Sequence, residues 1–545
     1  GFYSPAAPHA PYTSVLDEAV CVGSPEEAAA FLDAANLVRV AVEQRCDGLH
    51  PGYGFLSESA DLAQQCRAAN VVFIGPPTAT MRSLGSKIGA KKFVRSLGQS
   101  EAKVVPGYDG DGDESDDVLV EEAKKLNAWP LLVKASSGGG GRGMRIAQGA
   151  DDVAAAVAAA RREATAAFGC GKLLLERYIE HARHIEIQVV GDSHGNYECL
   201  FERECSVQRR HQKVVEEAPC GIIDEVLRQR FYSAALDIVK GMKYENVGTV
   251  EFVLDAASSP PQIYFLEVNA RIQVEHPVTE LITGVDIVAL QVGVAEGRSL
   301  NELLPPPLRP ELPRFLAPKS HAIEVRINAE HPVTFAPQIG KVYFFGVVDD
   351  GGAPIMTTTP TTTNTTDSTA VRVDAGVSSG SEVTIYYDSL LAKVVVAAPT
   401  RQQCLRAAAA VVSRVRVLGV TTNTEMLLRV LRHFAFDEGG RVPRMLTTNF
   451  LKEHQRSLVV DSSRSSSGAL ATTAVVVAVA AWCNDILNNH TNGLFKSITP
   501  GFRLSGGGVV PQRRAYRLHH DTHDDSSTTT STTAATTTTT TSTTA

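Results

Sequence analysis

Polar and apolar residues alternate along residues 267–275, at the end of the run 263–275. From Glu267 to Glu275 every odd position is polar or charged and every even position is apolar. Successive side chains of an extended strand point to opposite faces, so a period of two places the polar positions on one face and the apolar positions in the core. We therefore predict an extended segment whose polar face carries two carboxylates, two amides and a guanidinium. The alternative is a solvent-exposed amphipathic strand, which would usually carry Lys, Thr and Glu.

A second apolar strand, residues 248–254, lies just upstream. The turn-type segment 256–261 joins the two strands, which predicts a hairpin. Glu251 is a lone carboxylate within this strand, and a buried carboxylate is costly unless something pairs with it. A divalent cation shared by Glu251, Glu267 and Asn269 would do so. Ligation by oxygen atoms alone favours Mg²⁺ or Mn²⁺ over zinc.

Glycines cluster directly after the apolar strand 130–133, within the run from Lys134 to Arg145. Glycine lets the backbone approach phosphates closely and donate N–H groups to their oxygens. Because the lysine precedes the glycines, the order differs from that of a P-loop. A flexible linker is the alternative, but the flanking Lys134 and Arg142 favour a mobile loop that covers phosphates.

Three further runs lie close to these motifs. Residues 173–179 form an apolar strand that enters a polar turn, which suits an adenine-binding hinge. Residues 184–189 repeat the alternation of period two, and residues 205–213 form a basic cluster. Such a cluster is usually a solvated surface. Here it lies between two motifs that both suit phosphates, so a phosphate site is an equally good interpretation.

Composition and charge narrow the functional classes. The chain has 545 residues and is 43% hydrophobic, which suits roughly three or four globular units. Its net charge of −8 argues against nucleic acid as the main partner. The longest apolar stretch, residues 469–483, falls short of the ~20 residues that span a bilayer, so we expect a buried helix and no membrane span. Nine cysteines without a CxxC pair favour a reducing compartment and predict no zinc site.

A series of runs across about residues 40–455 resembles the biotin carboxylase component of biotin-dependent carboxylases, an ATP-grasp enzyme. Any one run would be weak evidence, but their common order is highly specific. The runs are His50–Glu58, Phe73–Pro77, Lys134–Arg145, Arg183–Gln188, Gln208–Pro219, Gly248–Phe252, Glu267–Glu280, His321–Glu330 and Tyr387–Lys393.

The resemblance implies an α/β fold: an ATP-grasp core, a truncated Rossmann-like N-terminal domain and a C-terminal α+β domain. It also implies an ATP-dependent ligase. ATP would phosphorylate bicarbonate to carboxyphosphate, which releases CO₂ and phosphate. The phosphate would then help to deprotonate biotin N1, which captures CO₂. The cofactors implied are ATP, Mg²⁺ or Mn²⁺, and biotin as a carrier-bound substrate.

The same resemblance assigns a role to each matching residue. The expected ATP ligands are Lys87, Lys134, Glu176, the Ile179 backbone, His184, Gln208 and His211, with Gly139 and Gly140 covering the phosphates. The expected metal ligands are Glu251, Glu267 and Asn269. The expected bicarbonate ligands are Arg271, Gln273 and the Val274 backbone. The expected catalytic groups are Glu275 as the base, which Arg271 keeps ionised, Lys213 on the transferred phosphoryl group, Arg326 on the biotin enolate, and Arg271.

The chain is expected to divide at proline-rich and low-complexity segments. The proline-rich stretch 305–318 separates the second unit from the third, and a Thr-rich insert at 357–369 is predicted to be a solvated loop. The expected units are a Rossmann-like domain at 1–84, an ATP-grasp domain at 85–300 with a Gly-rich lid at about 106–178, a biotin carboxylase C-terminal domain at 319–455, a weakly ordered region at 456–520 and a disordered Thr/Ser-rich tail at 521–545.

Three features depart from the family pattern. Position 270 is Ala where the family usually has Thr. Because even positions of this run face the core, we expect the substitution to have a mild effect on the neighbouring site. The usual start of the first domain is expected to be missing or replaced by residues 1–14. Since no Ala-Met-Lys-Met type attachment site is present, biotin is expected on a carrier domain elsewhere. The resemblance further implies bicarbonate, this carrier and a carboxyltransferase (beta) subunit as partners, within an oligomer.

The choice of acyl acceptor depends on one short segment. Residues 500–518 loosely resemble a region of the biotin-bearing subunit of 3-methylcrotonyl-CoA carboxylase, which acts in leucine degradation. The biotin carboxylase part of propionyl-CoA, acetyl-CoA or urea carboxylase is an alternative, as is an ATP-grasp ligase that joins a carboxylate to an amine. A degenerate assembly subunit without activity is a third. The expected location is the mitochondrial matrix in a eukaryote and the cytoplasm otherwise.

Overall fold

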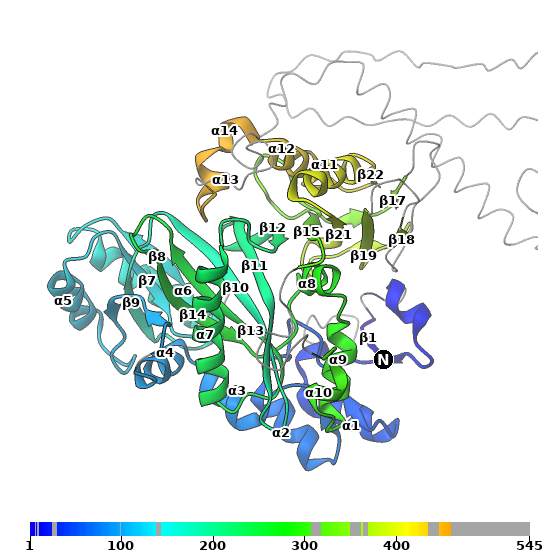
Figure 1. The fold of residues 1–545 in the computed structure, drawn as a ribbon, viewed down its shortest axis with the longest axis horizontal. Helices are drawn as coiled ribbons and strands as arrows, with labels where there is room; N and C mark the ends of the chain where they lie inside the picture. The colour runs from blue at the N-terminus through cyan, green and yellow to red at the C-terminus, as the bar shows by residue number, and fades with distance from the viewer. Residues whose placement is uncertain are drawn as a thin grey trace, which may run out of the picture. The chain divides into compact units, whose positions relative to one another are not determined.

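The computed structural model of the chain describes residues 1–5, 7, 10–23, 30–98, 100–137, 143–306, 318–348, 361–362, 369–433 and 446–458 (Figure 1). The expectations for residues 469–483, 500–518 and 521–545, and for 456–520 beyond residue 458, lie outside these residues. So do Gly139 and Gly140. Within the predicted Thr-rich loop, residues 361–362 form a short strand that pairs with residues 370–371, so this part of the loop prediction is wrong.

The N-terminal segment is built from short parallel strand pairs connected through helices, as expected for an α/β unit. β1 pairs with β2, and β3 pairs with β4, each in parallel. Asp33 and Ser59 cap the first two α-helices by accepting backbone N–H groups. The elements are β1 (Phe2–Tyr3), η1 (Pro11–Val15), β2 (Val20–Cys21), η2 (Ala30–Leu32), α1 (Ala34–Glu43), β3 (Gly48–Leu49), α2 (Ala60–Ala68), β4 (Val72–Phe73) and α3 (Thr78–Leu84).

A four-stranded antiparallel sheet and two helices form the next layer, which we call the lid. Leu131 and Val133 pack against Val157 and Ala160 of α6 in one apolar core. Alternation along the strand then places Lys134 on the opposite face. The elements are β6 (Gly107–Tyr108), α5 (Asp116–Leu126), β7 (Leu131–Ala135), β8 (Met144–Ala147), α6 (Val153–Phe168) and β9 (Leu173–Arg177), in sheet order β6-β9-β7-β8.

Among the described residues, ten strands form one central sheet, with all pairs antiparallel except β14 with β5. Strands from the third predicted unit extend the same sheet, because β15 pairs with β12. The sheet order is β18 (Thr361–Thr362), β19 (Ala370–Ala375), β21 (Leu390–Ala398), β15 (His321–Asn328), β12 (Gln212–Ala218), β11 (Tyr197–Arg209), β10 (Ala182–Gly191), β13 (Asn246–Asp255), β14 (Gln262–Asn269) and β5 (Lys103–Val104).

Helix α7 (Glu225–Gly241) covers one face of this sheet, as Figure 1 shows. Ile185 and Ile187 of β10 and Phe252 of β13 pack with Phe231 of α7 in a single core cluster. The intervening residues of β10 and β13 therefore point to the other face of the sheet. Burial against α7 thus determines which face carries the polar residues.

Helices also cover the C-terminal strands. Helix α8 packs on β11, β12, β15 and β21, while α11 packs on β15 and β21. The remaining elements are α4 (Lys87–Ser96), α8 (His276–Thr283), α9 (Ile287–Ala295), α10 (Leu300–Leu303), β16 (Gly340–Lys341), β17 (Phe344–Val347), β20 (Glu382–Val383), α11 (Arg401–Val412), β22 (Val415–Leu418), α12 (Thr424–Arg432), α13 (Phe450–Glu453) and α14 (Gln455–Leu458).

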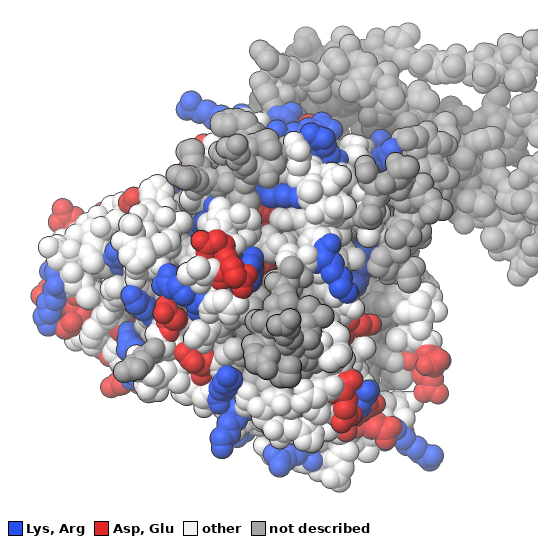
Figure 2. All heavy atoms as spheres, viewed as in Figure 1, with Lys and Arg blue, Asp and Glu red and all other residues white. Residues whose placement is uncertain are grey.

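Two surface properties bear on the expected partners. In the described residues no single helix is long and apolar enough to cross a membrane; α8 and α9 reach that length only together, with a 95° bend between them. Acidic and basic side chains lie side by side on the face shown in Figure 2, including the end where Figure 1 places α5. On α5, Lys124 and Lys125 form ion pairs with Glu121 and Glu122.

Candidate active site

The predicted hairpin is present, and it places two carboxylates opposite each other. Glu251 of β13 pairs in register with Glu267 of β14, and Thr249 pairs with Asn269. A register shift follows the Glu251–Glu267 pair, because Phe252 pairs with Phe265. Cross-strand neighbours on one face lie about 5 Å apart at Cβ. The three expected metal ligands therefore lie on one wall of the site.

The prediction of one extended segment from Glu267 to Glu275 is wrong. Strand β14 ends at Asn269, and the chain bends and turns before α8 begins at His276. Pro277 occupies the first turn of α8, where its fixed φ favours the helix. Val268, Ala270 and Ile272 are nevertheless buried. These apolar positions pack into two different core clusters, so their alternation does not reflect one continuous strand.

The ammonium of Lys213 lies at the centre of the site and contacts three carboxylates. Its Nζ donates to Glu186 at 2.5 Å, to Glu251 at 2.9 Å and to Glu275 at 2.7 Å. An ammonium has three N–H donors, so these contacts satisfy all of them. Burial alone would lower the pKa of Lys213, but the three carboxylates raise it well above its usual value. Lys213 is therefore a permanent cation.

The β11–β12 hairpin explains how Lys213 reaches this position. Arg210 and His211 form its two-residue turn, both with positive φ, and Gln208 pairs in register with Lys213. The register then shifts, so Val215 pairs with Val207. Such an irregularity redirects a side chain next to a site.

Glu275 connects Lys213 to Arg326. The Nη2 atom of Arg326 donates to Glu275 at 2.9 Å, and its Nε atom donates to Glu216 at 2.7 Å. Burial alone would raise the pKa of Glu275. Lys213, Arg326 and Arg203 outweigh burial and hold this pKa well below its usual range. The expectation of an ionised Glu275 agrees with this geometry, but its cations are Lys213 and Arg326, whereas Arg271 contacts Glu58 at 3.3 Å.

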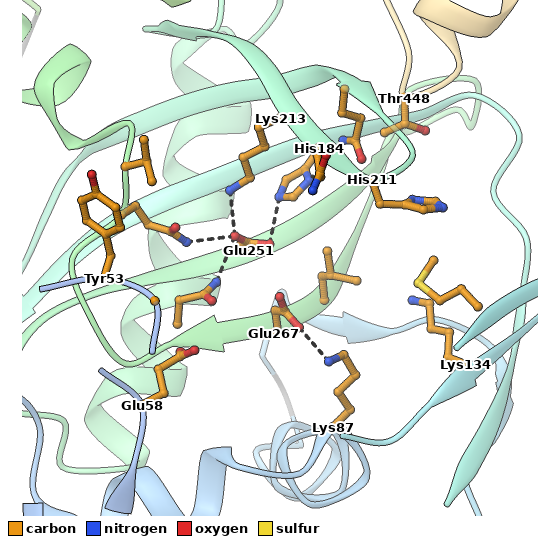
Figure 3. Close-up of a pocket in the computed structure, with 18 of the residues that line it drawn as sticks. Tyr53, Glu58, Lys87, Lys134, His184, His211, Lys213, Glu251, Glu267 and Thr448 are labelled. Carbon is orange, nitrogen blue, oxygen red and sulfur yellow. Dashed lines mark hydrogen bonds and ion pairs between the residues drawn. The ribbon is translucent and has the colours of Figure 1, made fainter. Parts of the chain in front are cut away.

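The side chains around Glu251 and Glu267 are donors and cations (Figure 3). Glu251 accepts from Asn269 at 2.9 Å and Gln273 at 3.1 Å, and its other oxygen lies 3.0 Å from His184 Nε2. Glu267 forms an ion pair with Lys87 at 3.1 Å. Both carboxylates line the cavity. Oxygen donors grouped on one wall fit a hard divalent cation such as Mg²⁺ or Mn²⁺.

A second charged cluster lies between the lid and α4. Glu176 of β9 contacts both Lys134 of β7 and Lys91 of α4. Burial would raise the pKa of Glu176, but the two lysines lower it to about 2. Lys91 also lies 3.3 Å from Asp109, which contacts Arg95. Three cations thus contact two carboxylates, and Lys134 and Glu176 are the members of this cluster that line the cavity.

A cavity of about 930 Å³ brings the predicted residues together. Lid, central sheet and C-terminal strands all contribute to its wall, and the size suits a ligand as large as a nucleotide. All described residues that the sequence assigned to the site line it except Glu275, which is fully buried behind Lys213 and Arg326: Lys87, Lys134, Glu176, Ile179, His184, Gln208, His211, Lys213, Glu251, Glu267, Asn269, Arg271, Gln273, Val274 and Arg326.

Some residues of the site were missed. Glu186 lies between His184 and Gln188 in the alternating run, so its parity already placed it on the polar face. Lys91 is four residues after Lys87, which puts both on one face of a helix. Glu216 carried no such signal, because its contact with Arg326 joins residues far apart in the sequence.

Comparisons with known proteins agree with this architecture. The biotin carboxylase N-terminal domain matches residues 1–81, the ATP binding domain of the carbamoyl-phosphate synthase L chain matches 90–303, and the biotin carboxylase C-terminal domain matches 324–453. Biotin carboxylase 2 of Bacillus subtilis is 38% identical over 453 residues, covering 83% of this chain and 93% of the relative.

A longer relative is matched only in part. The mitochondrial methylcrotonoyl-CoA carboxylase subunit alpha of Oryza sativa subsp. japonica is 38% identical over 482 residues, 88% of this chain. The chain spans 60% of that subunit's length.

Solved structures show the same fold. A biotin carboxylase complex with β,γ-ATP from Campylobacter jejuni has a TM-score of 0.73 and 33% identity, with 83% of this chain and 92% of that chain covered. The biotin carboxylase domain of Hydrogenobacter thermophilus 2-oxoglutarate carboxylase, in complex with MgADP, ADP and bicarbonate, has a TM-score of 0.74 and 35% identity, with 85% and 93% covered. The fold, the matched domains and these relatives show that the chain belongs to the biotin carboxylase family of ATP-dependent ligases.

Proposed function

We propose that the chain carboxylates biotin at the expense of ATP and bicarbonate, the first half-reaction of a biotin-dependent acyl-CoA carboxylase. One observation carries the proposal. Glu275, a buried and ionised carboxylate, connects Lys213 at the phosphate side of the cavity to Arg326 at the C-terminal strands. A base between a phosphoryl-binding cation and an enolate-binding cation is the arrangement that the two chemical steps require.

ATP would bind on the lid side of the cavity. Lys134 and Lys87 supply charge for its phosphates, and Glu176 holds the first of these lysines in place. His184, Gln208, His211 and the backbone of Ile179 also line this region. Gly139 and Gly140 are proposed to cover the phosphates. Phosphoryl transfer depends mainly on position and charge, so these cations provide much of the catalysis.

Glu251, Glu267 and Asn269 would hold Mg²⁺ or Mn²⁺. A divalent cation bound there supplies positive charge to the phosphate oxygens and reduces repulsion between ATP and bicarbonate. The present partners of these carboxylates, Lys213, His184 and Lys87, are the groups that would have to rearrange on binding.

Bicarbonate would bind at the bend after β14. Arg271 and Gln273 line the cavity side by side, with Arg271 Nη1 donating to Gln273 at 2.8 Å, and the Val274 backbone lies next to them. Glu275 would take the bicarbonate proton, so that the oxygen can attack the terminal phosphorus of ATP and displace ADP. Lys213 would steady the transferred phosphoryl group. After CO₂ release, phosphate would take the N1 proton of biotin, and Arg326 would stabilise the enolate.

The direct test measures phosphate release by the purified chain with ATP, Mg²⁺, bicarbonate and free biotin. We expect turnover that requires bicarbonate and increases with biotin. Turnover that requires an amine would identify a carboxylate–amine ligase and reject the proposal. ATP binding without any turnover would identify a non-catalytic assembly subunit.

We further propose 3-methylcrotonyl-CoA as the final acceptor, because relatives from rice and Arabidopsis thaliana are named methylcrotonoyl-CoA carboxylase alpha subunits. A biotin carrier, a carboxyltransferase subunit, an oligomer and a mitochondrial location (cytoplasmic in a bacterium) belong to this proposal. The matched segments support the division into 1–84, 85–300 and 319–455. Carboxylation of 3-methylcrotonyl-CoA against propionyl-CoA and acetyl-CoA, with added carrier and carboxyltransferase, tests the acceptor.

A further inference from the structure

Glu324 of β15 is a fully buried carboxyl group whose two side-chain oxygens have no hydrogen-bond partner among the described residues. Leaving such a group ionised and unpartnered in the interior is energetically costly. Buried polar atoms without a partner are rare in folded proteins and call for a physical explanation.

The residue opposite Glu324 is a second buried glutamate. Glu216 of β12 pairs in register with Glu324, so their Cβ atoms lie about 5 Å apart. Glu216 Oε1 accepts from Arg326 Nε at 2.7 Å and lies 2.6 Å from Nη2, whereas Glu216 Oε2 has no partner in the described part of the chain. Arg326 follows Glu324 by two residues and therefore shares its face of the strand. Three unpartnered carboxylate oxygens thus belong to one cross-strand pair.

The charged groups packed around Glu324 are already engaged elsewhere. Lys393 of β21 donates to the Val274 carbonyl at 2.6 Å and lies 3.3 Å from Asp374 of β19. Arg372 of β19 contacts Asp374 and Glu280. On the α8 side, Glu275 contacts Lys213 and Arg326. Burial, with Lys393, lowers the pKa of His276 to about 3, so this imidazole is neutral.

The rest of the surroundings are apolar. Val395 pairs in register with Glu324 across β21, and Ala322, Val278 and Ile282 complete the adjacent core cluster. Neither glutamate lines the cavity, and both are 0% exposed. This closed and apolar setting suits a proton rather than a hydrated cation, which would need room and several more oxygen ligands.

Two like charges on such a pair cannot both persist. Burial raises the pKa of Glu216 to about 7, and it raises that of Glu324 well above its usual value. Arg326 opposes the shift through direct contacts at Glu216 only. Glu216 is therefore the member that ionises, and Glu324 the member that keeps the proton.

We propose that Glu324 is a protonated carboxylic acid that donates its O–H to Glu216 Oε2, and that this pair positions Arg326 against Glu275. Glu324 acts through Glu216 and Arg326, so it is a positioning residue rather than a catalytic one. The presence of the proton is inferred from the burial, strand register and contacts of the pair and does not depend on the proposed function. Its effect on catalysis does depend on the proposed function.

The proton is tested by unfolding measurements on the full chain between pH 6 and pH 9 (about the range in which Glu216 ionises). An acid whose pKa is raised by folding binds a proton in the folded state that the unfolded state has lost, so stability falls as pH rises. We expect Glu324→Gln to fold. Its free energy of unfolding should fall less steeply with pH than that of the wild type, by up to the slope that one bound proton contributes. Glu217→Gln is the matched control, because Glu217 on the same strand contacts Arg401 and His321, which lower its pKa to about 2. This control should lose stability at neutral pH and keep the slope.

The hydrogen bond is tested by a second, isosteric pair of variants. Glu324→Gln retains an N–H donor, while Glu324→Met fills the same space without one. We expect Glu324→Gln to keep kcat for biotin-dependent ATP hydrolysis within about threefold at neutral pH and to extend the alkaline limb of its pH profile. Glu324→Met should lower kcat about tenfold, the typical cost of one lost hydrogen bond, with KM for ATP unchanged.

The proposal is overturned if the free energy of unfolding of Glu324→Gln depends on pH as steeply as that of the wild type. It is also overturned if Glu324→Gln and Glu324→Met have equal kcat. It is also overturned if K⁺ or Mg²⁺, compared with choline, stabilises the wild-type chain but not Glu324→Gln, since the pair would then hold a cation. If the wild-type chain shows no biotin-dependent turnover, the proposed function fails while the slope still decides whether the proton is present.

Discussion

The lid cluster and the central cluster use the same residue types with opposite charge balance. In the lid cluster Lys91, Lys134 and Arg95 contact Glu176 and Asp109. In the central cluster Glu186, Glu216, Glu251 and Glu275 surround Lys213, Arg203 and Arg326. The lid cluster therefore has one more cation than carboxylates, and the central cluster has one more carboxylate than cations.

The difference follows from the number of strands that contribute. Glu176 and Lys134 lie on adjacent strands of a small sheet, with one lysine added from α4. The central cluster draws on β10, β11, β12, β13 and β15 together with the turn before α8. A wide sheet can bring several carboxylates together, provided that cations such as Lys213 and Arg326 lie between them.

The largest expected effect comes from removing Glu275, the proposed base in the central cluster. Glu275→Gln should lower bicarbonate-dependent phosphate release at least ~100-fold, because an amide cannot accept the bicarbonate proton. ATP affinity, measured by nucleotide titration, should stay within about threefold of the wild type. Bicarbonate-dependent turnover close to that of the wild type would show that the central cluster does not contain the base.

The matching change in the lid cluster should affect binding instead. Lys134→Gln removes one of the two lysines at Glu176 and one of the proposed phosphate contacts, so KM for ATP should rise by about 10- to 100-fold, the cost of a charged hydrogen bond. The loss of kcat should be smaller. Lys125→Gln on the exposed face of α5 is the control and should leave KM unchanged. If Lys134→Gln and Glu275→Gln changed KM for ATP equally, the two clusters would not differ in function.

The pH dependence of stability should reveal the lowered pKa of Glu176. The pKa of Glu176 is lowered to about 2, so its stabilising contribution is present above pH ~4.3 and is lost as pH falls towards 2. The loss is about 1.4 kcal/mol for each pH unit in that window. Denaturant unfolding without ATP should show Glu176→Gln less stable than the wild type at pH 6, with the difference shrinking as pH falls. A constant difference would contradict the lowered pKa.

The smallest expected effect is at position 270. Ala270 follows Asn269 of the proposed metal site and is buried in the core that contacts α7, and its backbone N–H donates to Glu58 at 3.1 Å. Ala270→Thr should change stability by about 1 kcal/mol and turnover by less than about threefold. Thermal unfolding and phosphate release check both values. A large change in turnover would mean that this core position controls how the proposed metal ligands beside it are placed.

Local sequence carried much of the fold and of the site. The alternation in β10 and β14 predicted which side chains lie on the polar face, because period two is a property of any extended strand. The turn-type segment between β13 and β14 predicted the hairpin that carries Glu251 and Glu267. The alternation failed after Asn269, where Arg271 to Glu275 form a bend and turn: Ile272 is buried there too, and burial alone does not distinguish a strand from a loop.

The sequence by itself determined the family, the hairpin and the residue types of the site. Only the tertiary structure decided which charges meet. Lys213 contacts Glu275, Arg326 contacts Glu275 and Glu216, and Glu324 lies opposite Glu216, although these residues come from separate segments of the chain. Sheet order and register set those contacts, and they depend on how distant strands pack rather than on local periodicity. The protonation of each carboxyl group follows from those neighbours, so it too is a property of the folded chain.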